Sequence, residues 1–134
     1  MKALSTFELE ATHSSLVEAP RHNLLFKGKS TGFITEASDV VAQYQVGELY
    51  LIATVLENPK KEKLECYLFD KEFNQISYKK YSGWMTTAFM VTGQEVKSEC
   101  ELELVLNKTI RIQLRVKKSS LPWRRWRLFL EPKM

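Results

Sequence analysis

The stretch VVAQYQVGELYLIATVL, residues 40–56, has the pattern of a β-hairpin. Apolar residues recur at every second position on both sides of Gly47-Glu48, and a two-residue loop with glycine first favours a type II′ turn. Such a turn would align four apolar pairs on one face: Val46 with Leu49, Tyr44 with Leu51, Ala42 with Ala53, and Val40 with Val55. The opposite face of 48–56 is also apolar, so we expect this strand to be central in its sheet.

A second hairpin is predicted in ECELELVLNKTIRIQLRVKK, residues 99–118. A three-residue loop at 107–109 places the leucines and isoleucines of both strands on one face. On the other face, charged and polar residues then meet across the strands: Glu103 beside Gln113, Glu101 opposite Arg115, and Glu99 opposite Lys117. Because opposite charges in such positions attract, we expect the glutamates to neutralise part of the positive charge of 111–117.

The rest of the chain has the same two-residue period. Six further strands are predicted, at 6–12, 24–29, 64–70, 75–81, 87–92 and 123–130, and only 14–23 suits a helical turn as well as a loop. This spacing predicts an all-β fold: a single antiparallel β-sandwich spanning residues 1–134, with a closed β-barrel as the alternative. Jelly-roll, C2-like and immunoglobulin-like sandwiches would all give this pattern.

The bulk composition indicates an ordinary globular protein. The chain has 134 residues, 44% of them hydrophobic and 27% charged. The opening residues reach Glu8 and Glu10 without an apolar run, and no segment approaches the roughly 18 apolar residues of a membrane helix. We therefore expect a cytoplasmic protein that does not insert into membranes. Cys66 and Cys100 are in phase with apolar neighbours, which favours reduced core residues over a disulfide.

The charge is unevenly distributed. Residues 107–134 hold nine lysines and arginines and one glutamate, which gives +8. The whole chain carries +4, so residues 1–106 must sum to −4. An acidic body with a basic C-terminal quarter indicates a partner of negative charge.

The segment LPWRRWRLFLEP, residues 121–132, concentrates this charge next to aromatic side chains. On one strand, Trp126, Leu128 and Leu130 share a face, which we expect to be buried, and Arg125 and Arg127 point the other way into solvent. No run of glutamates lies beside this strand in the sequence. The residues predicted to bind a partner are therefore Trp123, Arg124, Arg125 and Arg127.

Three functions fit this pattern. The first is a non-enzymatic interaction module that docks an acidic partner protein, since Arg and Trp are enriched at binding hot spots. The second is a nucleic-acid-binding protein that uses the same face for phosphates and stacked bases. The third is a small-ligand or carbohydrate-binding β-sandwich centred on Trp84, with Tyr81 nearby.

Catalytic and metal-binding motifs are not found in the sequence. There is no P-loop, GxSxG, GxGxxG or HExxH motif, and the cysteines match no zinc spacing. His13 and His22 are interpreted as exposed loop histidines. We therefore expect no enzyme activity, no metal and no cofactor. The segment FDKEFN around Asp70 is typical of a hairpin turn.

Overall fold

The computed structural model describes residues 1–12, 21–56, 63–82, 89–118 and 126–133. These residues form β-strands joined by turns, and no helix occurs among them. In chain order the strands are β1 (Lys2–Ala3), β2 (Phe7–Ala11), β3 (His22–Phe26), β4 (Lys29–Thr35), β5 (Asp39–Val46), β6 (Leu49–Leu56), β7 (Lys63–Phe69), β8 (Gln75–Ser82), β9 (Val91–Ser98), β10 (Glu101–Leu106), β11 (Ile110–Lys118) and β12 (Trp126–Lys133).

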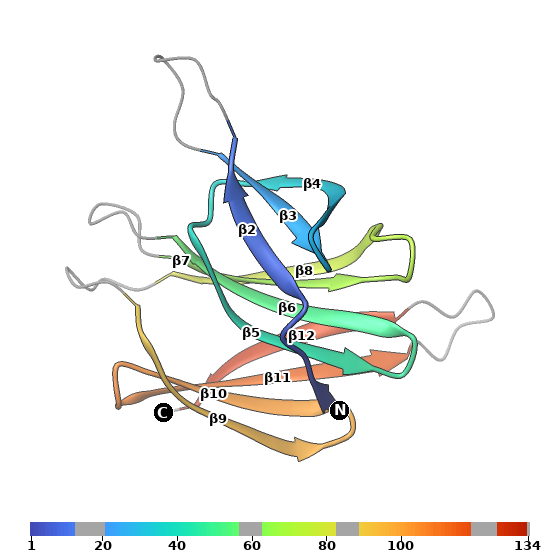
Figure 1. Ribbon diagram of the computed structural model, residues 1–134. Helices are drawn as coiled ribbons and strands as arrows, with labels where there is room; N and C mark the ends of the chain where they lie inside the picture. The colour runs from blue at the N-terminus through green and yellow to red at the C-terminus, as the bar shows by residue number, and fades with distance from the viewer. Residues whose placement is uncertain (13–20, 57–62, 83–88, 119–125, 134) are drawn as a thin grey trace.

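The strands make three antiparallel sheets, and none of them closes into a barrel (Figure 1). The central sheet has the order β1-β5-β6-β7-β8, the C-terminal sheet β12-β11-β10-β9, and the N-terminal sheet β2-β3-β4. The all-β prediction is confirmed, and the architecture agrees with a β-sandwich.

The main core lies between the central and C-terminal sheets. Apolar side chains at alternate positions of both sheets point into this layer, and most of them are inaccessible to solvent. The larger ones are Leu51, Leu64, Leu68, Leu102, Leu104, Leu106, Ile112, Leu114 and Leu128. Cys66 is buried in this core and Cys100 packs at its margin; both are free thiols, as predicted.

A second core covers the other face of the central sheet. Ile52, Tyr67 and Phe69 from the central sheet pack against Phe7 and Leu24 of the N-terminal sheet. Tyr50 extends this contact by packing edge-on against Phe7, at 5.3 Å between ring centroids. The central sheet is thus covered on both sides, which confirms that β6 is a central strand. The N-terminal sheet is a third layer that the sequence did not predict.

The first hairpin has the predicted register from Val46–Leu49 to Ala42–Ala53. Gly47 has φ +59°, and Glu48 has no positive φ, as a type II′ turn requires. Beyond Ala42 an irregularity shifts the register, so that Val40 faces Thr54. The predicted pair of Val40 with Val55 is therefore wrong, because a bulge adds one residue to β5.

The second hairpin is also confirmed, with Leu104 opposite Ile112 and Glu101 opposite Arg115. Its loop is Asn107–Thr109, where Asn107 and Lys108 adopt φ of +52° and +65°. The predicted pair of Glu99 with Lys117 is wrong, because β10 begins only at Glu101.

Two parts of the chain differ from the predicted strands. The single strand expected at 24–29 is instead the β3–β4 hairpin, which turns at Lys27 and Gly28 with φ of +52° and +80°. The strand expected at 87–92 lies later, at Val91–Ser98, where most side chains are exposed and give a weak apolar alternation. His22 belongs to β3 and is half-buried, so its interpretation as an exposed loop histidine is wrong. His13 lies outside the described residues.

Candidate binding surface on the C-terminal sheet

The final strand, β12, presents different side chains to its two faces. Leu128 is fully buried, and Trp126 and Leu130 are half-buried against the main core. Arg127 and Phe129 point the other way, and Phe129 is 41% exposed. The predicted alternation is therefore confirmed for Leu128 and Arg127. Trp126 and Leu130 are only partly covered, because β12 is at the edge of its sheet.

Contacts on both sides hold β12 in place. It pairs with β11 along its whole length, from Lys118–Trp126 to Arg111–Lys133. On its other side the backbone N–H of Leu128 donates a hydrogen bond of 2.9 Å to the Ser77 hydroxyl of β8. The edge strand of the C-terminal sheet, β12, is thus bonded to β8, the edge strand of the central sheet. These contacts hold the orientation of β12, in which Arg127 points away from the main core.

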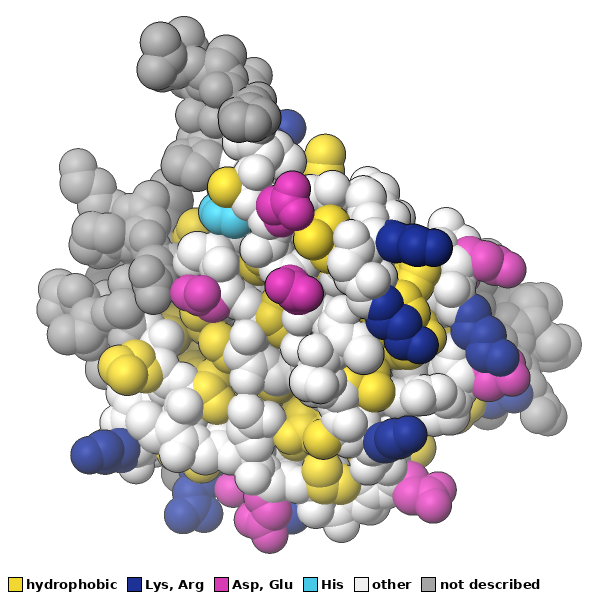
Figure 2. All heavy atoms as spheres, viewed as in Figure 1, with side chains coloured by type: hydrophobic (Ala, Val, Ile, Leu, Met, Phe, Trp, Pro, Cys, Tyr) yellow, Lys and Arg dark blue, Asp and Glu magenta, His cyan; other side chains and the backbone are white. Residues whose placement is uncertain are grey.

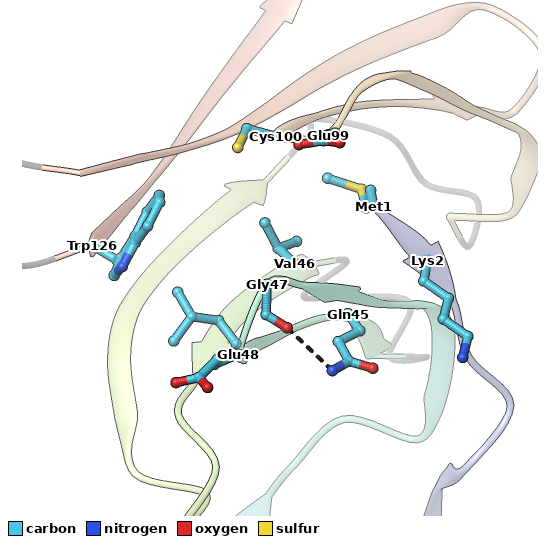
Figure 3. Close-up of a pocket in the computed structure, with 10 residues that line it drawn as sticks. Met1, Lys2, Gln45, Val46, Gly47, Glu48, Glu99, Cys100 and Trp126 are labelled. Carbon is cyan, nitrogen blue, oxygen red and sulfur yellow. Dashed lines mark hydrogen bonds between the residues drawn. The ribbon is translucent and has the colours of Figure 1, made fainter.

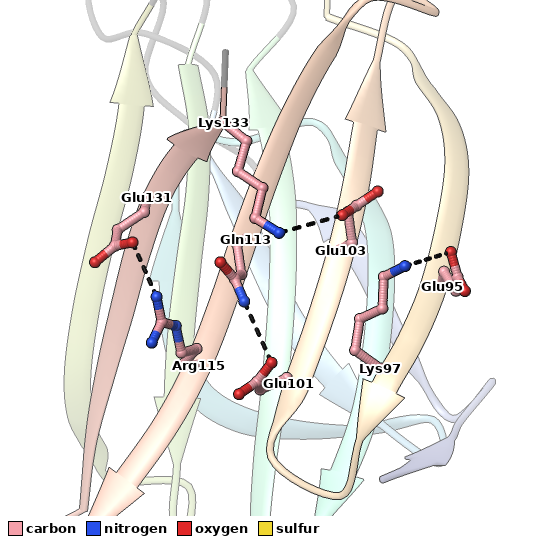
Figure 4. A network of polar contacts seen from close by, with 8 residues as sticks. All are labelled: Glu95, Lys97, Glu101, Glu103, Gln113, Arg115, Glu131 and Lys133. Carbon is pink, nitrogen blue, oxygen red and sulfur yellow. Dashed lines mark hydrogen bonds and ion pairs between the residues drawn. The ribbon is translucent and has the colours of Figure 1, made fainter.

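Most charges on the outer face of the C-terminal sheet are paired with each other (Figure 4). Arg115 forms an ion pair with Glu131 at 3.0 Å, and Lys133 approaches Glu103 at 3.9 Å. Glu101 accepts a hydrogen bond of 3.2 Å from the Gln113 amide. The expected neutralisation is present, but Arg115 pairs with Glu131 of β12 rather than with the glutamate opposite it on β10.

At one end of this face, two cations have no carboxylate partner among the described residues. Lys117 and Arg127 are direct cross-strand partners, both exposed, and neither forms an ion pair with a described residue. Arg111 and Lys133 also face each other at the far end of β11, but there Lys133 reaches Glu103. Two like charges side by side are unfavourable, so Lys117 and Arg127 repel each other across the two strands.

Aromatic rings accompany these cations. The Lys117 ammonium lies over the Phe129 ring at 5.9 Å from its centroid, and the Lys118 ammonium lies over Trp126 at 5.7 Å. Both distances are within the range of cation–π attraction. We call this set the basic-aromatic end; it consists of Lys117, Arg127 and Phe129 on the outer face, and of Lys118 and Trp126, which strand alternation places on the opposite face at the same end of the sheet.

An open recess adjoins the basic-aromatic end, between the central and C-terminal sheets (Figure 3). Its volume is about 930 Å³, and its apolar lining includes Val46, Leu49 and Trp126. Glu48 lies at the rim and is paired with Lys71 at 3.0 Å. The recess and the basic-aromatic end share the Trp126 side chain.

Several residues predicted from the sequence are not brought into this site. Tyr81 is half-buried, and its ring lies 5.8 Å from that of Phe89 at the margin of the main core. Trp84, the centre of the proposed carbohydrate site, lies outside the described residues. So do Trp123, Arg124 and Arg125. Of the predicted partner-binding residues, only Arg127 is described.

Sequence reasoning missed Lys117, Lys118 and Phe129 as part of the site. Lys117 was expected to pair with Glu99, but Glu99 lies in the β9–β10 turn, before the ladder between β10 and β11 begins. The signal that could have found them is the β11–β12 register, which puts Lys117 opposite Arg127 and Arg115 opposite Phe129. That register depends on the length of the 119–125 connection.

A second polar cluster lies between the central and N-terminal sheets. The Tyr78 and Tyr67 hydroxyls donate hydrogen bonds to the same Glu65 oxygen, at 2.6 and 3.1 Å. Burial, together with the Glu65 charge, raises the pKa of both phenols. Thr35 extends the cluster by a 3.4 Å contact with the Tyr67 hydroxyl. The cluster joins the two layers through the contact of Thr35 with Tyr67.

Within the described part of the chain, no group of three His, Cys, Asp or Glu side chains is placed to hold a metal ion. The described residues also contain no helix that could cross a membrane. In comparisons with known proteins, no family model, curated protein or solved structure matched this chain.

Proposed function

We propose that this protein is a non-enzymatic interaction module that docks an acidic protein surface through the basic-aromatic end. The observation that carries the proposal is the cross-strand pair Lys117–Arg127, two exposed cations with no ion pair to a described residue, on a face where Arg115 and Lys133 are both paired. Carboxylates from a partner would relieve this repulsion and add charge-assisted hydrogen bonds.

The exposed Phe129 ring supports docking to a protein. It lies beside Arg127 on the same face of β12 and is 41% exposed. Aromatic and arginine side chains together are enriched in the energetically dominant part of protein interfaces.

Nucleic acid is the second candidate, because cations next to aromatic rings also suit single strands. Stacking a base requires a free ring face, however. The Lys117 and Lys118 ammonium groups lie over the rings of Phe129 and Trp126, so one face of each ring is already in contact with a cation. This arrangement favours the acidic protein over the nucleic acid.

The test compares two labelled probes of equal net charge by fluorescence anisotropy: an acidic peptide with glutamates at alternate positions, and a single-stranded oligodeoxynucleotide. The native protein should bind the peptide more tightly, and binding should weaken as salt screens the charges. The variant Lys117→Glu with Arg127→Glu should lose this binding.

The matched control is Lys27→Glu with Lys29→Glu. These two exposed lysines lie at the β3–β4 turn, in a different layer, and the change in net charge is the same. The control should keep peptide binding within about a factor of two to three, because net charge acts weakly at a distance in salt. Equal losses in both variants would contradict a specific site, and tighter binding of the oligonucleotide would favour the second candidate.

A further inference from the structure

The outer face of the N-terminal sheet has a charge pattern opposite to that of the basic-aromatic end. In β2, Phe7 and Leu9 point toward the central sheet, so Glu8 and Glu10 point outward. Both carboxylates are exposed, and neither forms an ion pair with a described residue. Figure 2 views the molecule from this side and shows carboxylate side chains over the N-terminal sheet.

An exposed apolar residue lies on this acidic face too. Ile34 of β4 is 53% exposed, and it is in one row with Glu10 through their common neighbour Asn23. Leu25, which faces Glu8, adds a half-buried apolar side chain. We call this set the acidic face; it consists of Glu8, Glu10, Leu25 and Ile34. Its two carboxylates beside apolar side chains complement the two cations beside Phe129.

The two surfaces cannot satisfy each other within one chain. The central sheet lies between the N-terminal and C-terminal sheets, so their outer faces point in opposite directions. Two sheet-to-sheet spacings of about 10 Å each separate them. That distance exceeds the Debye length of about 8 Å at physiological ionic strength.

We infer that the acidic partner of the basic-aromatic end is the acidic face of a second copy of this chain. This inference rests on the proposed function and names its partner. Glu8 and Glu10, about 7 Å apart on one strand, would meet Lys117 and Arg127, about 5 Å apart across two strands. The long lysine and arginine side chains can span this difference. Ile34 would then lie beside Phe129.

Such a contact joins two different surfaces, so each copy keeps one of them open. Copies therefore add head to tail instead of stopping at a symmetric dimer. Because the contact consists mainly of exposed charges, association should be weak, concentration-dependent and sensitive to salt.

Analytical ultracentrifugation of the native chain over a range of concentrations tests this inference. At low salt, the average mass should rise above that of a dimer at high concentration, and high salt should restore the monomer. Two variants replace the charged residues of one surface each by uncharged glutamine: Glu8→Gln with Glu10→Gln, and Lys117→Gln with Arg127→Gln. Each variant alone should self-associate more weakly by about two- to thirtyfold, because two exposed ion pairs are lost.

Mixing the two variants gives the decisive result. The first variant retains the basic-aromatic end and the second retains the acidic face, so the equimolar mixture should form a one-to-one complex and nothing larger. The control Lys27→Gln with Lys29→Gln removes two exposed cations next to the acidic face, so it should associate at least as strongly as the native chain. Circular dichroism of each variant checks that it is folded.

The outcomes separate this inference from the proposed function. A native chain that stays monomeric at every concentration would overturn the inference, as would a mixture without the one-to-one complex. If the acidic peptide still binds through Lys117 and Arg127 in either case, docking of an acidic protein stands and only the second copy is excluded. If the chain neither self-associates nor binds the acidic peptide through Lys117 and Arg127, both proposals are wrong.

Discussion

Lys117 and Arg127 face each other across β11 and β12, and both side chains extend from the same exposed face. Directly opposed like charges destabilise a sheet by some tenths of a kcal/mol. Along the same two strands, Arg115 is paired with Glu131 at 3.0 Å, so the sheet neutralises a cation where a carboxylate is adjacent. These two cations, which form no ion pair with a described residue, therefore lower the stability of the sheet locally, and we expect a negatively charged partner to remove this effect.

This relationship predicts that function and stability oppose each other at position 127. Arg127→Glu would place a carboxylate opposite Lys117 and turn a repulsive cross-strand pair into an attractive one. We expect the free energy of unfolding to rise by about 0.2–1 kcal/mol, while affinity for the acidic peptide falls. Urea denaturation and peptide anisotropy measure the two effects. A variant that is less stable than the native chain would show that repulsion between Lys117 and Arg127 does not lower the stability of the native sheet.

Leu128 should be far more important for stability than its neighbour Phe129. Leu128 is fully buried in the main core, whereas Phe129 is 41% exposed on the outer face. Leu128→Ala should cost about 2–5 kcal/mol, because it leaves a cavity. Phe129→Ala should cost about 1 kcal/mol or less but weaken peptide binding. Urea midpoints for both variants check the order, and equal costs would contradict the described orientation of β12.

Much of the fold could be predicted from local sequence, because the length and type of each turn implied the same register as the alternation of apolar residues in its two strands. The glycine-first loop at 47–48 and the three-residue loop at 107–109 each fixed a register that the structure shares. The N-terminal sheet could not be predicted in the same way. Its β3–β4 turn has Lys27 at φ +52°, a conformation for which lysine gives no signal.

The candidate site was predicted only in part, because the register between β11 and β12 could not be read from the sequence. The alternation of β12 was enough to expect Arg127 in solvent. The register between β11 and β12 does not follow from the seven-residue length of the 119–125 connection, so sequence alone could not place Lys117 beside Arg127. Glu99 was expected to neutralise Lys117, but it lies in the β9–β10 turn, before β10 and its ladder with β11 begin at Glu101.

The β7–β8 turn predicts a pH dependence of stability. Asp70 accepts hydrogen bonds from the backbone N–H groups of Asn74 and Glu72, both at 2.9 Å, and from the Asn74 side chain at 3.1 Å. These bonds, with the backbone of Asn74 first, hold the pKa of the Asp70 carboxyl below its usual value. Because the folded pKa is lowered, its contribution is complete above the pKa of the unfolded chain and is lost as pH falls through the folded value.

The variant Asp70→Asn tests this dependence. At neutral pH it should be less stable than the native chain, and the difference should shrink as the solution becomes acidic. Asp70 is at the surface, where solvent screens the charge, so the effect should be small. Urea denaturation at several pH values measures it, and NMR titration of the Asp70 carboxyl reports the folded pKa directly. A difference that stays constant with pH would show that the carboxylate form is not preferred in the folded state.

Removing β12 should destroy the fold, whereas reversing its charge should not. A chain that ends after residue 120 lacks Leu128, which is buried among the side chains of the main core, and lacks the strand that pairs with β11 from end to end. The core would be exposed beside Leu114 and Val116, and β11 would become an open apolar edge, which promotes aggregation.

Lys117→Glu with Arg127→Glu changes only exposed side chains, so it should keep native stability and lose acidic-peptide binding. Circular dichroism and sedimentation distinguish the two results. A truncated chain that remains folded and monomeric would show that β12 serves binding alone and that the core is complete without it.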